Sequence, residues 1–214
     1  IPPPDELPGL GSLKAAYPLP QNLALWLEEA ETLAEIQDPA GDDRGSNGEL
    51  SYPEAFGSLR PGDLTGLRWL HSPSGGYILE IQLKDPLSQV WNPPHGLDHV
   101  SLDIQFEGIQ DEEPVSARFE LNGWSASGAQ PWEWYSLPQK GKIYAVFGAQ
   151  HPLGKEITSL LQGETSCTIR VQTWDVDGDG RPRPLQSSPS TYQFGGDPEA
   201  EAWMDQSVLR VNQK

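Results

Sequence analysis

Hydrophobic and polar residues alternate at every second position along much of the chain after Asp38. Residues 77–83 and 100–107 show the pattern most clearly, with polar side chains between most of the hydrophobic ones. A half-buried β-strand requires this period of two. Further strands, each bounded by Gly, Pro or Asn, are predicted at residues 116–121, 142–147, 166–175 and 191–194. Short strands separated by long loops predict an all-β sandwich.

The N-terminal part of the chain follows a different pattern. From Asn22 to about Ala34 the hydrophobic residues recur at helical spacing, which predicts a short helix that docks on the sandwich. The preceding residues contain six prolines, so they favour an extended connector. We therefore predict a linker and possible short helix over residues 1–31 and one sandwich over residues 32–214. The polar stretch after Gly196 predicts either a final strand or a frayed end.

Composition narrows the class of partner and cofactor. The 214 residues include 22 Gly and 21 Pro, which suits a turn-rich fold, and the formal net charge is −17. Such a charge repels nucleic acid, whereas it suits hard cations such as calcium, which take carboxylate ligands. No run of residues is apolar enough to span a membrane. The chain does not begin with Met, and we expect it to be a processed or excised piece of a longer product.

The sequence gives little support for catalysis. Cys167 is the only cysteine, so it forms no disulfide within the chain, and the alternation around it predicts a buried small hydrophobe. The four histidines form no HExxH motif, and GWSASG is not a nucleophile elbow. Of the many carboxylates, Glu133 stands in a suggestive setting between two tryptophans, but any acidic chain offers such pairs by chance. We expect a non-enzyme.

Two acidic clusters are candidate cation sites. In the first, DPAGDDRG, Asp38, Asp42 and Asp43 lie within six residues that Pro and Gly fold back, and Asp63 follows in a later turn. This cluster predicts either a cation site or an acidic solvated turn. In the second, DVDGDG, carboxylates alternate before a glycine, as in half of an EF-hand, but the twelfth position is Gln186. A calcium loop at Asp175 and Asp177 and a Gly-rich turn both stay open there.

Three segments resemble one known family. DPAGDDRGSNGELSYPEAFGSLRPGDLTGLRWL is similar to the opening of the C-terminal module of glucodextranases. VWNPPHGLDHVSLDIQFE resembles their Asn-Pro-Trp segment and the next strand, and TWDVDGDGRPRPLQSSPSTYQFGG resembles their closing segment. The sequence departs from the pattern twice, because Asp63 follows Gly62 without a phenylalanine and Pro94 replaces an aromatic residue. The resemblance covers roughly residues 32–196.

The resemblance implies a jelly-roll-like antiparallel sandwich, related to DOMON and family-nine carbohydrate-binding modules and attached to a glucan-degrading enzyme. It implies an extracellular, cell-surface or periplasmic location. It also associates the early GDD segment with calcium, which strengthens a metal site at the aspartates of the first cluster, and backbone carbonyls near Tyr52 are candidates to complete it. The expected partners are α-glucan polysaccharide or oligosaccharide, or a cell-surface polymer, and the parent catalytic domain.

Sugar recognition requires aromatic faces on which the C–H surfaces of a pyranose can stack. Trp124, Trp132 and Trp134 lie in a turn-rich stretch, where they are candidates either to bind sugar or to cover the core under the loop. Trp91, beside Asn92-Pro93-Pro94, is a further candidate. The alternative function is a calcium-stabilised structural or anchoring module with no sugar affinity. A haem site through Met204 is a third hypothesis, which the polar surroundings of Met204 disfavour.

Overall fold

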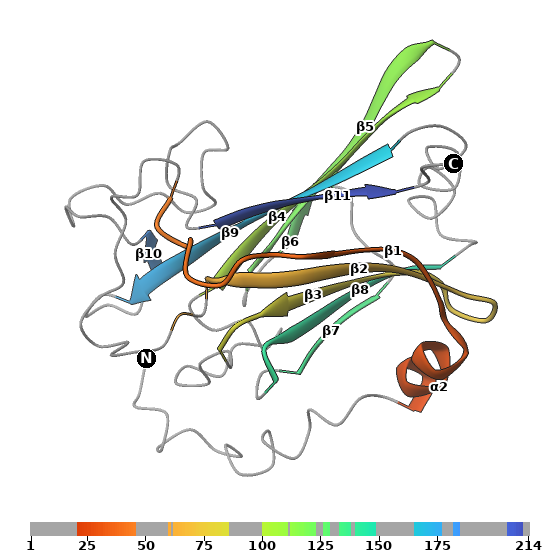
Figure 1. Ribbon diagram of the computed structural model, residues 1–214, viewed down its shortest axis with the longest axis horizontal. Coiled ribbons are helices and arrows are strands. Elements are labelled where there is room, and N and C mark those ends of the chain that lie inside the picture. Colours follow the sequence, from red (N-terminus) through yellow and green to blue (C-terminus); the bar gives the residue numbers. More distant parts are fainter. Residues whose placement is uncertain are drawn as a thin grey trace.

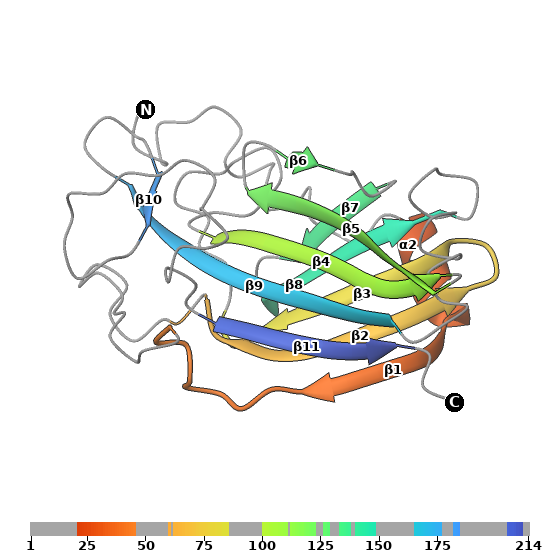
Figure 2. The same cartoon turned by 90° about the horizontal axis from the view of Figure 1, so that it is seen from above.

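The protein is a sandwich of two antiparallel sheets that pack face to face (Figure 1). This computed structural model describes residues 21–45, 60, 62–85, 100–110, 112–122, 126–128, 133–137, 140–148, 165–176, 182–184 and 205–211. In Figure 2 the viewer looks onto the outer face of the six-stranded sheet, and the five-stranded sheet lies behind it. The predicted all-β sandwich is confirmed.

The five-stranded sheet has the strand order β1-β2-β3-β8-β7. Its strands are β1 (Glu31–Gln37), β2 (Leu64–Ser72), β3 (Gly76–Leu83), β8 (Lys142–Phe147) and β7 (Glu133–Leu137). The six-stranded sheet has the order β10-β9-β4-β5-β6, with β11 paired to the same edge strand β9 as β10. Its strands are β4 (Val100–Gln110), β5 (Glu113–Asn122), β6 (Ala126–Gly128), β9 (Thr165–Val176), β10 (Pro182–Pro184) and β11 (Asp205–Val211).

Strands far apart in the sequence form the centre of each sheet. β3 pairs with β8 and β4 pairs with β9, so the chain leaves each sheet and returns to it, as jelly-roll architectures require. The inner faces of the two sheets meet in one core that contains Trp69, Phe106, Phe119, Phe147 and the buried Cys167. The aromatic rings of Trp69, Phe106 and Phe147 lie within 6 Å of one another, centroid to centroid. These contacts couple the two sheets.

The alternating segments of the sequence form the expected strands. The segments predicted at residues 77–83, 100–107, 116–121, 142–147 and 166–175 correspond to β3, β4, β5, β8 and β9. The stretch after Gly196 supplies a final strand, β11. The strand predicted at residues 191–194 and the linker at residues 1–20 lie outside the described residues. Nothing in the structure tests the domain boundary at residue 31, which stays a prediction.

The predicted helix is real, but its extent was wrong. Helix α2 spans Gln21–Glu29 only, and the chain enters β1 at Glu31. Leu33, which the helical spacing placed on the docking face, is 45% exposed on β1. Backbone pairing of β1 with β2 overrides the weak helical preference of this segment, because a strand in a sheet satisfies all its backbone groups on the paired side.

Helix α2 docks on the outer face of the five-stranded sheet (Figure 1). Leu23 and Trp26 are buried there, against hydrophobic side chains of β2, β3 and β8. Glu29, at the end of the helix, accepts hydrogen bonds from the Ser72 hydroxyl and the Ser74 amide in the turn between β2 and β3. The five-stranded sheet is therefore hydrophobic on both faces, whereas the outer face of the other sheet is polar.

The contact between helix and turn leaves no room for a side chain at Gly75. A Cβ atom there would lie 2.6 Å from Cγ of Trp26. We expect Gly75→Ala to lower the free energy of unfolding by about 1–3 kcal/mol, because the helix has to shift to relieve the overlap. Urea unfolding measures this loss. In a Trp26→Ala background the same change should cost far less, and equal costs in both backgrounds would contradict the contact.

Candidate functional site

Three carboxylates from distant parts of the chain converge at one end of the sandwich. Asp38 and Asp42 belong to the loop that follows β1, and Asp205 begins β11. Each offers a carboxylate oxygen, and these oxygens lie within 4.8 Å of one another. β11 contacts both β1 and β2, which brings its first residue to the start of the loop. The geometry therefore depends on both the N-terminal and the C-terminal strands.

A fourth aspartate, Asp63, fixes the loop that carries Asp38 and Asp42. Both carboxylate oxygens of Asp63, which is fully buried, accept hydrogen bonds from the Gly41 amide, at 3.1 and 2.9 Å. Lys84 forms an ion pair with Asp63 at 3.2 Å. Gly41 has a φ of 98°, a left-handed conformation that glycine adopts without strain. Asp63 thus holds the loop closed through the backbone.

Hydrogen bonds from β11 and β2 orient two of the three converging carboxylates, those of Asp205 and Asp38. Asp205 accepts from the Leu64 amide at 2.7 Å and from the Gln206 amide at 2.8 Å. One oxygen of Asp38 accepts from the Ser207 hydroxyl at 3.0 Å, and the other oxygen, Oδ2, is buried with no hydrogen-bond partner. A buried carboxylate oxygen without a hydrogen-bond partner costs folding free energy. Asp38 therefore has one oxygen that a bound ligand could still pair with.

Burial and mutual repulsion disfavour the charged forms of the carboxyl groups in this cluster. Burial raises the pKa of the Asp38 carboxyl, and the charges of Asp42 and Asp63 raise it further, although the hydrogen bond from Ser207 opposes the shift. Burial also raises the pKa of Asp205 to about 7, and the charges of Asp38 and Asp42 add to this effect. Carboxyl groups that resist ionisation side by side are stabilised by a proton or by a cation between them.

The donor set suits a hard divalent cation. Calcium takes carboxylate and carbonyl oxygens in flexible geometry, and three aspartates from separate segments can supply three such ligands. Asp38 belongs to this set and its buried Oδ2 has no hydrogen-bond partner, so coordination through Oδ2 would satisfy that oxygen. If a cation binds, Asp38, Asp42 and Asp205 are the residues that would hold it, and it would supply the positive charge that the cluster lacks.

The predicted metal ligands separate into three groups. Asp38 and Asp42 lie in the cluster. Asp63 holds the loop, and Asp43 is a buried residue of that loop; neither belongs to the converging set. Tyr52 and Asp177 lie outside the described residues. The backbone of Asp175 lies in β9, but its side chain is not described. A ligand role for these five residues stays a prediction: Asp43, Asp63, Tyr52, Asp175 and Asp177.

Asp205 was missing from the sequence-based site. It lies 167 positions after Asp38 in a polar stretch near the end of the chain, where Glu199 and Glu201 precede it and nothing distinguishes it from these acidic neighbours. A weak signal was present in the strand itself, since Asp205, Ser207 and Leu209 alternate and all three are buried. Buried polar residues at alternate positions of a strand indicate that its inner face meets something polar.

Among the four predicted sugar-binding tryptophans, only Trp134 is described. It lies on strand β7, half-buried, and packs against the main core, which favours the core-covering alternative for this residue. Trp124, Trp132 and Trp91 lie outside the described residues. Glu133 is half-buried on the same strand. Cys167 is buried, and burial raises the pKa of its thiol, as expected for a structural cysteine.

The early loop and the first strands also carry the similarity to known proteins. Residues 33–137 match the family described as the C-terminal binding-module, SLH-like, of glucodextranase. This confirms the resemblance for a segment that runs from within β1 to the end of β7 and contains Asp38, Asp42 and Asp63, whereas Asp205 lies beyond it. The wider similarity to DOMON and family-nine modules stays a prediction. No curated protein and no solved structure matches the chain.

The helical part of the described structure is short. In the ranges that the structure describes, no helix combines the length and apolar character that crossing a bilayer demands.

Proposed function

We propose that this chain is a non-catalytic, calcium-stabilised accessory module of an α-glucan-degrading enzyme, acting outside the cytoplasm, and that it binds carbohydrate. The glucodextranase family match over residues 33–137 supports a binding module of a carbohydrate-active enzyme. The observation that carries the calcium part is the convergence of Asp38, Asp42 and Asp205, with one buried oxygen left without a partner.

A module of this kind acts through linkage. When it holds a glucan, the attached catalytic domain meets substrate at a raised effective concentration, without any new contact in the active site. Calcium in this role is structural, because it ties the loop after β1 to the start of β11 and so favours the folded state by mass action. No chemical step is assigned to the module.

A structural or anchoring module without sugar affinity is the second candidate. Leu25 on α2 and Leu33 on β1 are 54% and 45% exposed, and large exposed hydrophobic residues suit packing against another domain or an envelope component. The family description "SLH-like" belongs to the matched family and leaves this candidate open for the chain.

Isothermal titration separates the two candidates in one preparation. Chelator-treated protein is titrated with calcium and then with starch, dextran and their oligosaccharides. Calcium binding followed by saturable glucan binding is the expected result. Calcium binding without any sugar response would replace the proposal with the anchoring module, and absence of calcium binding would refute the metal site.

A further inference from the structure

The outer face of the six-stranded sheet carries polar side chains in three rows that run across four strands. Strand pairing aligns residues of β11, β9, β4 and β5 side by side. The first row is Gln206, Arg170, Asp103 and Glu120, the second is Val208, Thr168, Gln105 and Arg118, and the third is Arg210, Ser166, Glu107 and Ser116. The residues between them in sequence face the core, so these rows face away from it.

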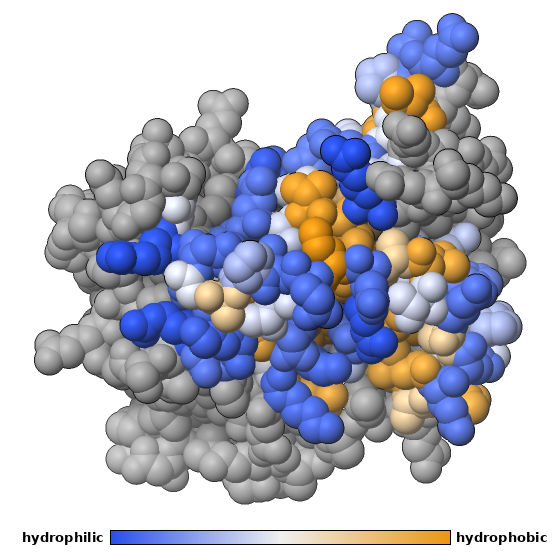
Figure 3. Space-filling view, in the orientation of Figure 1, coloured by the Kyte–Doolittle hydropathy of each residue, from blue (hydrophilic) through white to orange (hydrophobic). Residues whose placement is uncertain are grey.

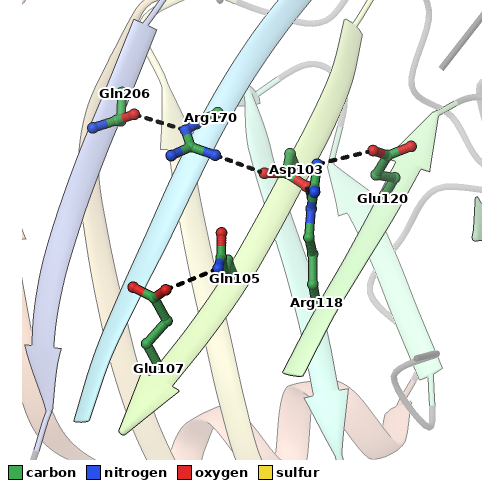
Figure 4. A network of polar contacts seen from close by, with 7 residues as sticks. All are labelled: Asp103, Gln105, Glu107, Arg118, Glu120, Arg170 and Gln206. Atoms are coloured by element: carbon green, nitrogen blue, oxygen red, sulfur yellow. Dashed lines mark hydrogen bonds and ion pairs between the residues drawn. The ribbon is translucent and has the colours of Figure 1, made fainter. Parts of the chain in front are cut away.

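Asp103 organises the first two rows (Figure 4). Its side chain is fully buried, and it accepts a hydrogen bond from Arg118 at 2.6 Å and another from Arg170 at 3.4 Å. Arg118 also reaches Glu120 at 3.2 Å, and Arg170 donates to Gln206 at 2.8 Å. The guanidinium groups are therefore held in fixed orientations, while about a quarter to a third of each arginine side chain stays exposed.

The third row opens into a groove of about 460 Å³. Glu107, Ile109, Ser166, Val208 and Arg210 line it, together with Gly108 and Thr165. Ile109 and Val208 are large hydrophobic residues that are 60% and 39% exposed. In Figure 3 hydrophobic areas stand out among hydrophilic ones over β11 and β9 and at the projecting β4–β5 hairpin. The volume falls within the range of about 300–1,000 Å³ that is usual for ligand sites.

The charges on this face balance, although the whole chain is strongly acidic. Among the described side chains of β11, β9, β4 and β5 that face outward, three arginines oppose three carboxylates, so their sum is zero. They are Arg118, Arg170 and Arg210 against Asp103, Glu107 and Glu120. Such a face offers oriented donors and acceptors without a net field. A neutral ligand rich in hydroxyl groups fits it better than an anion or a cation.

We propose that this groove, with the rows that lead into it, is the carbohydrate-binding surface and takes a neutral glucan chain along the outer face of β11, β9 and β4. The inference rests on the proposed function, since it says where and how the module binds sugar. Glu107 and Arg210 pair with sugar hydroxyls, and Ile109 and Val208 cover the apolar C–H surface of the ring. Hydrogen bonds dominate this mode. Ile109 and Val208 take the place of the aromatic faces expected from the sequence, so binding here does not depend on the tryptophans of the turn-rich stretch.

The test compares groove variants with matched variants on the other sheet. Glu107→Ala with Arg210→Ala should weaken binding of a starch or dextran oligosaccharide at least about tenfold, since it removes two charged groups that pair with the sugar hydroxyls. Glu35→Ala on β1 with Lys140→Ala before β8, two exposed changes that also remove one charge of each sign, should leave binding unchanged. All variants are compared with wild type by thermal melting, to show that the fold is kept. Backbone NMR shifts on adding the oligosaccharide should concentrate at residues 107–109, 165–166 and 208–210.

The outcomes separate the location from the function. If wild type binds glucan but the groove variant binds equally well and the shifts lie elsewhere, the groove assignment is overturned and the proposed function stands. If wild type binds no glucan while still binding calcium, both fall. Loss of binding in the groove variant alone, with shifts at the groove, supports the assignment.

Discussion

In the presence of a chelator, the protein should lose stability as the pH rises from about 5 to about 8, and excess calcium should abolish this loss. Asp205 has a folded-state pKa of about 7 against an ordinary value of 3.8, and the pKa of Asp38 is also raised. At pH values between the ordinary pKa of Asp205 and its folded-state pKa, the folded state binds more protons than the unfolded state. The stability is therefore complete below the unfolded pKa and is lost as the pH rises through the folded pKa.

Calcium should replace the protons as the neutralising charge, so that melting temperatures in calcium vary little over this range. Asp42→Asn tests the cause, because Asp42 is exposed and its removal takes one charge from the cluster. In chelator at pH 8 this variant should melt above wild type, and calcium should raise its melting temperature less. Glu113→Gln, which removes one exposed charge on the β4–β5 hairpin, controls for net charge. Identical pH profiles for wild type with calcium and with chelator would contradict the site.

Removal of the Asp103 side chain should produce the largest loss of stability on the outer face of the six-stranded sheet. Asp103→Ala leaves Arg118 and Arg170 without the buried carboxylate that lies between them. Loss of one partner from a buried ion pair costs about 3–5 kcal/mol, and partial exposure of both arginines lowers the expected cost to about 2–4 kcal/mol. Urea unfolding measures it directly, and the melting temperature should fall by about 2–4 °C for each kcal/mol.

Glu120→Gln is the matched control for this change. Glu120 contacts the same arginine at 3.2 Å, but its side chain is 28% exposed, so its loss should cost under about 1 kcal/mol. Raised salt should narrow the gap between Glu120→Gln and wild type more than the gap between Asp103→Ala and wild type, because buried pairs are screened less. Equal stabilities of Asp103→Ala and wild type would show that Asp103 does not organise the face.

Local alternation was sufficient to predict β4 and β5, because these strands bury one face and expose the other. β3 and β8 are buried on both faces, since helix α2 covers the outer side of their sheet, and they were predicted from short stretches of hydrophobic residues between turn residues. β1 could not be predicted in the same way. Its burial is shallow, its pairing shifts register between Thr32 and Ala34, and its hydrophobic residues fall at helical spacing by chance. Tertiary pairing decided between helix and strand, and the sequence holds no local record of that pairing.

The candidate cation site was predictable by half for a similar reason. Asp38 and Asp42 stand close together in a turn-forming segment, so their convergence is a local property. Asp205 joins them through β11, whose pattern is misleading: Val208 faces solvent while Asp205 and Ser207 face inward. Hydrophobic periodicity assigns such a strand to the wrong face or to no face. The polar inward positions Asp205 and Ser207 lie at the candidate site.

The meeting of the loop after β1 with the start of β11 has a kinetic consequence. Ser207 and Asp38 are 169 residues apart in the chain, so their contact closes nearly the whole domain into one loop. Contacts of such long range depend on both edges of the fold already being in place. A cation held there would add stability that the folding transition state lacks, and it would lengthen the lifetime of the native state by slowing unfolding while leaving the folding rate nearly unchanged. In a chain with a single cysteine, this is the protection that a disulfide gives to other proteins.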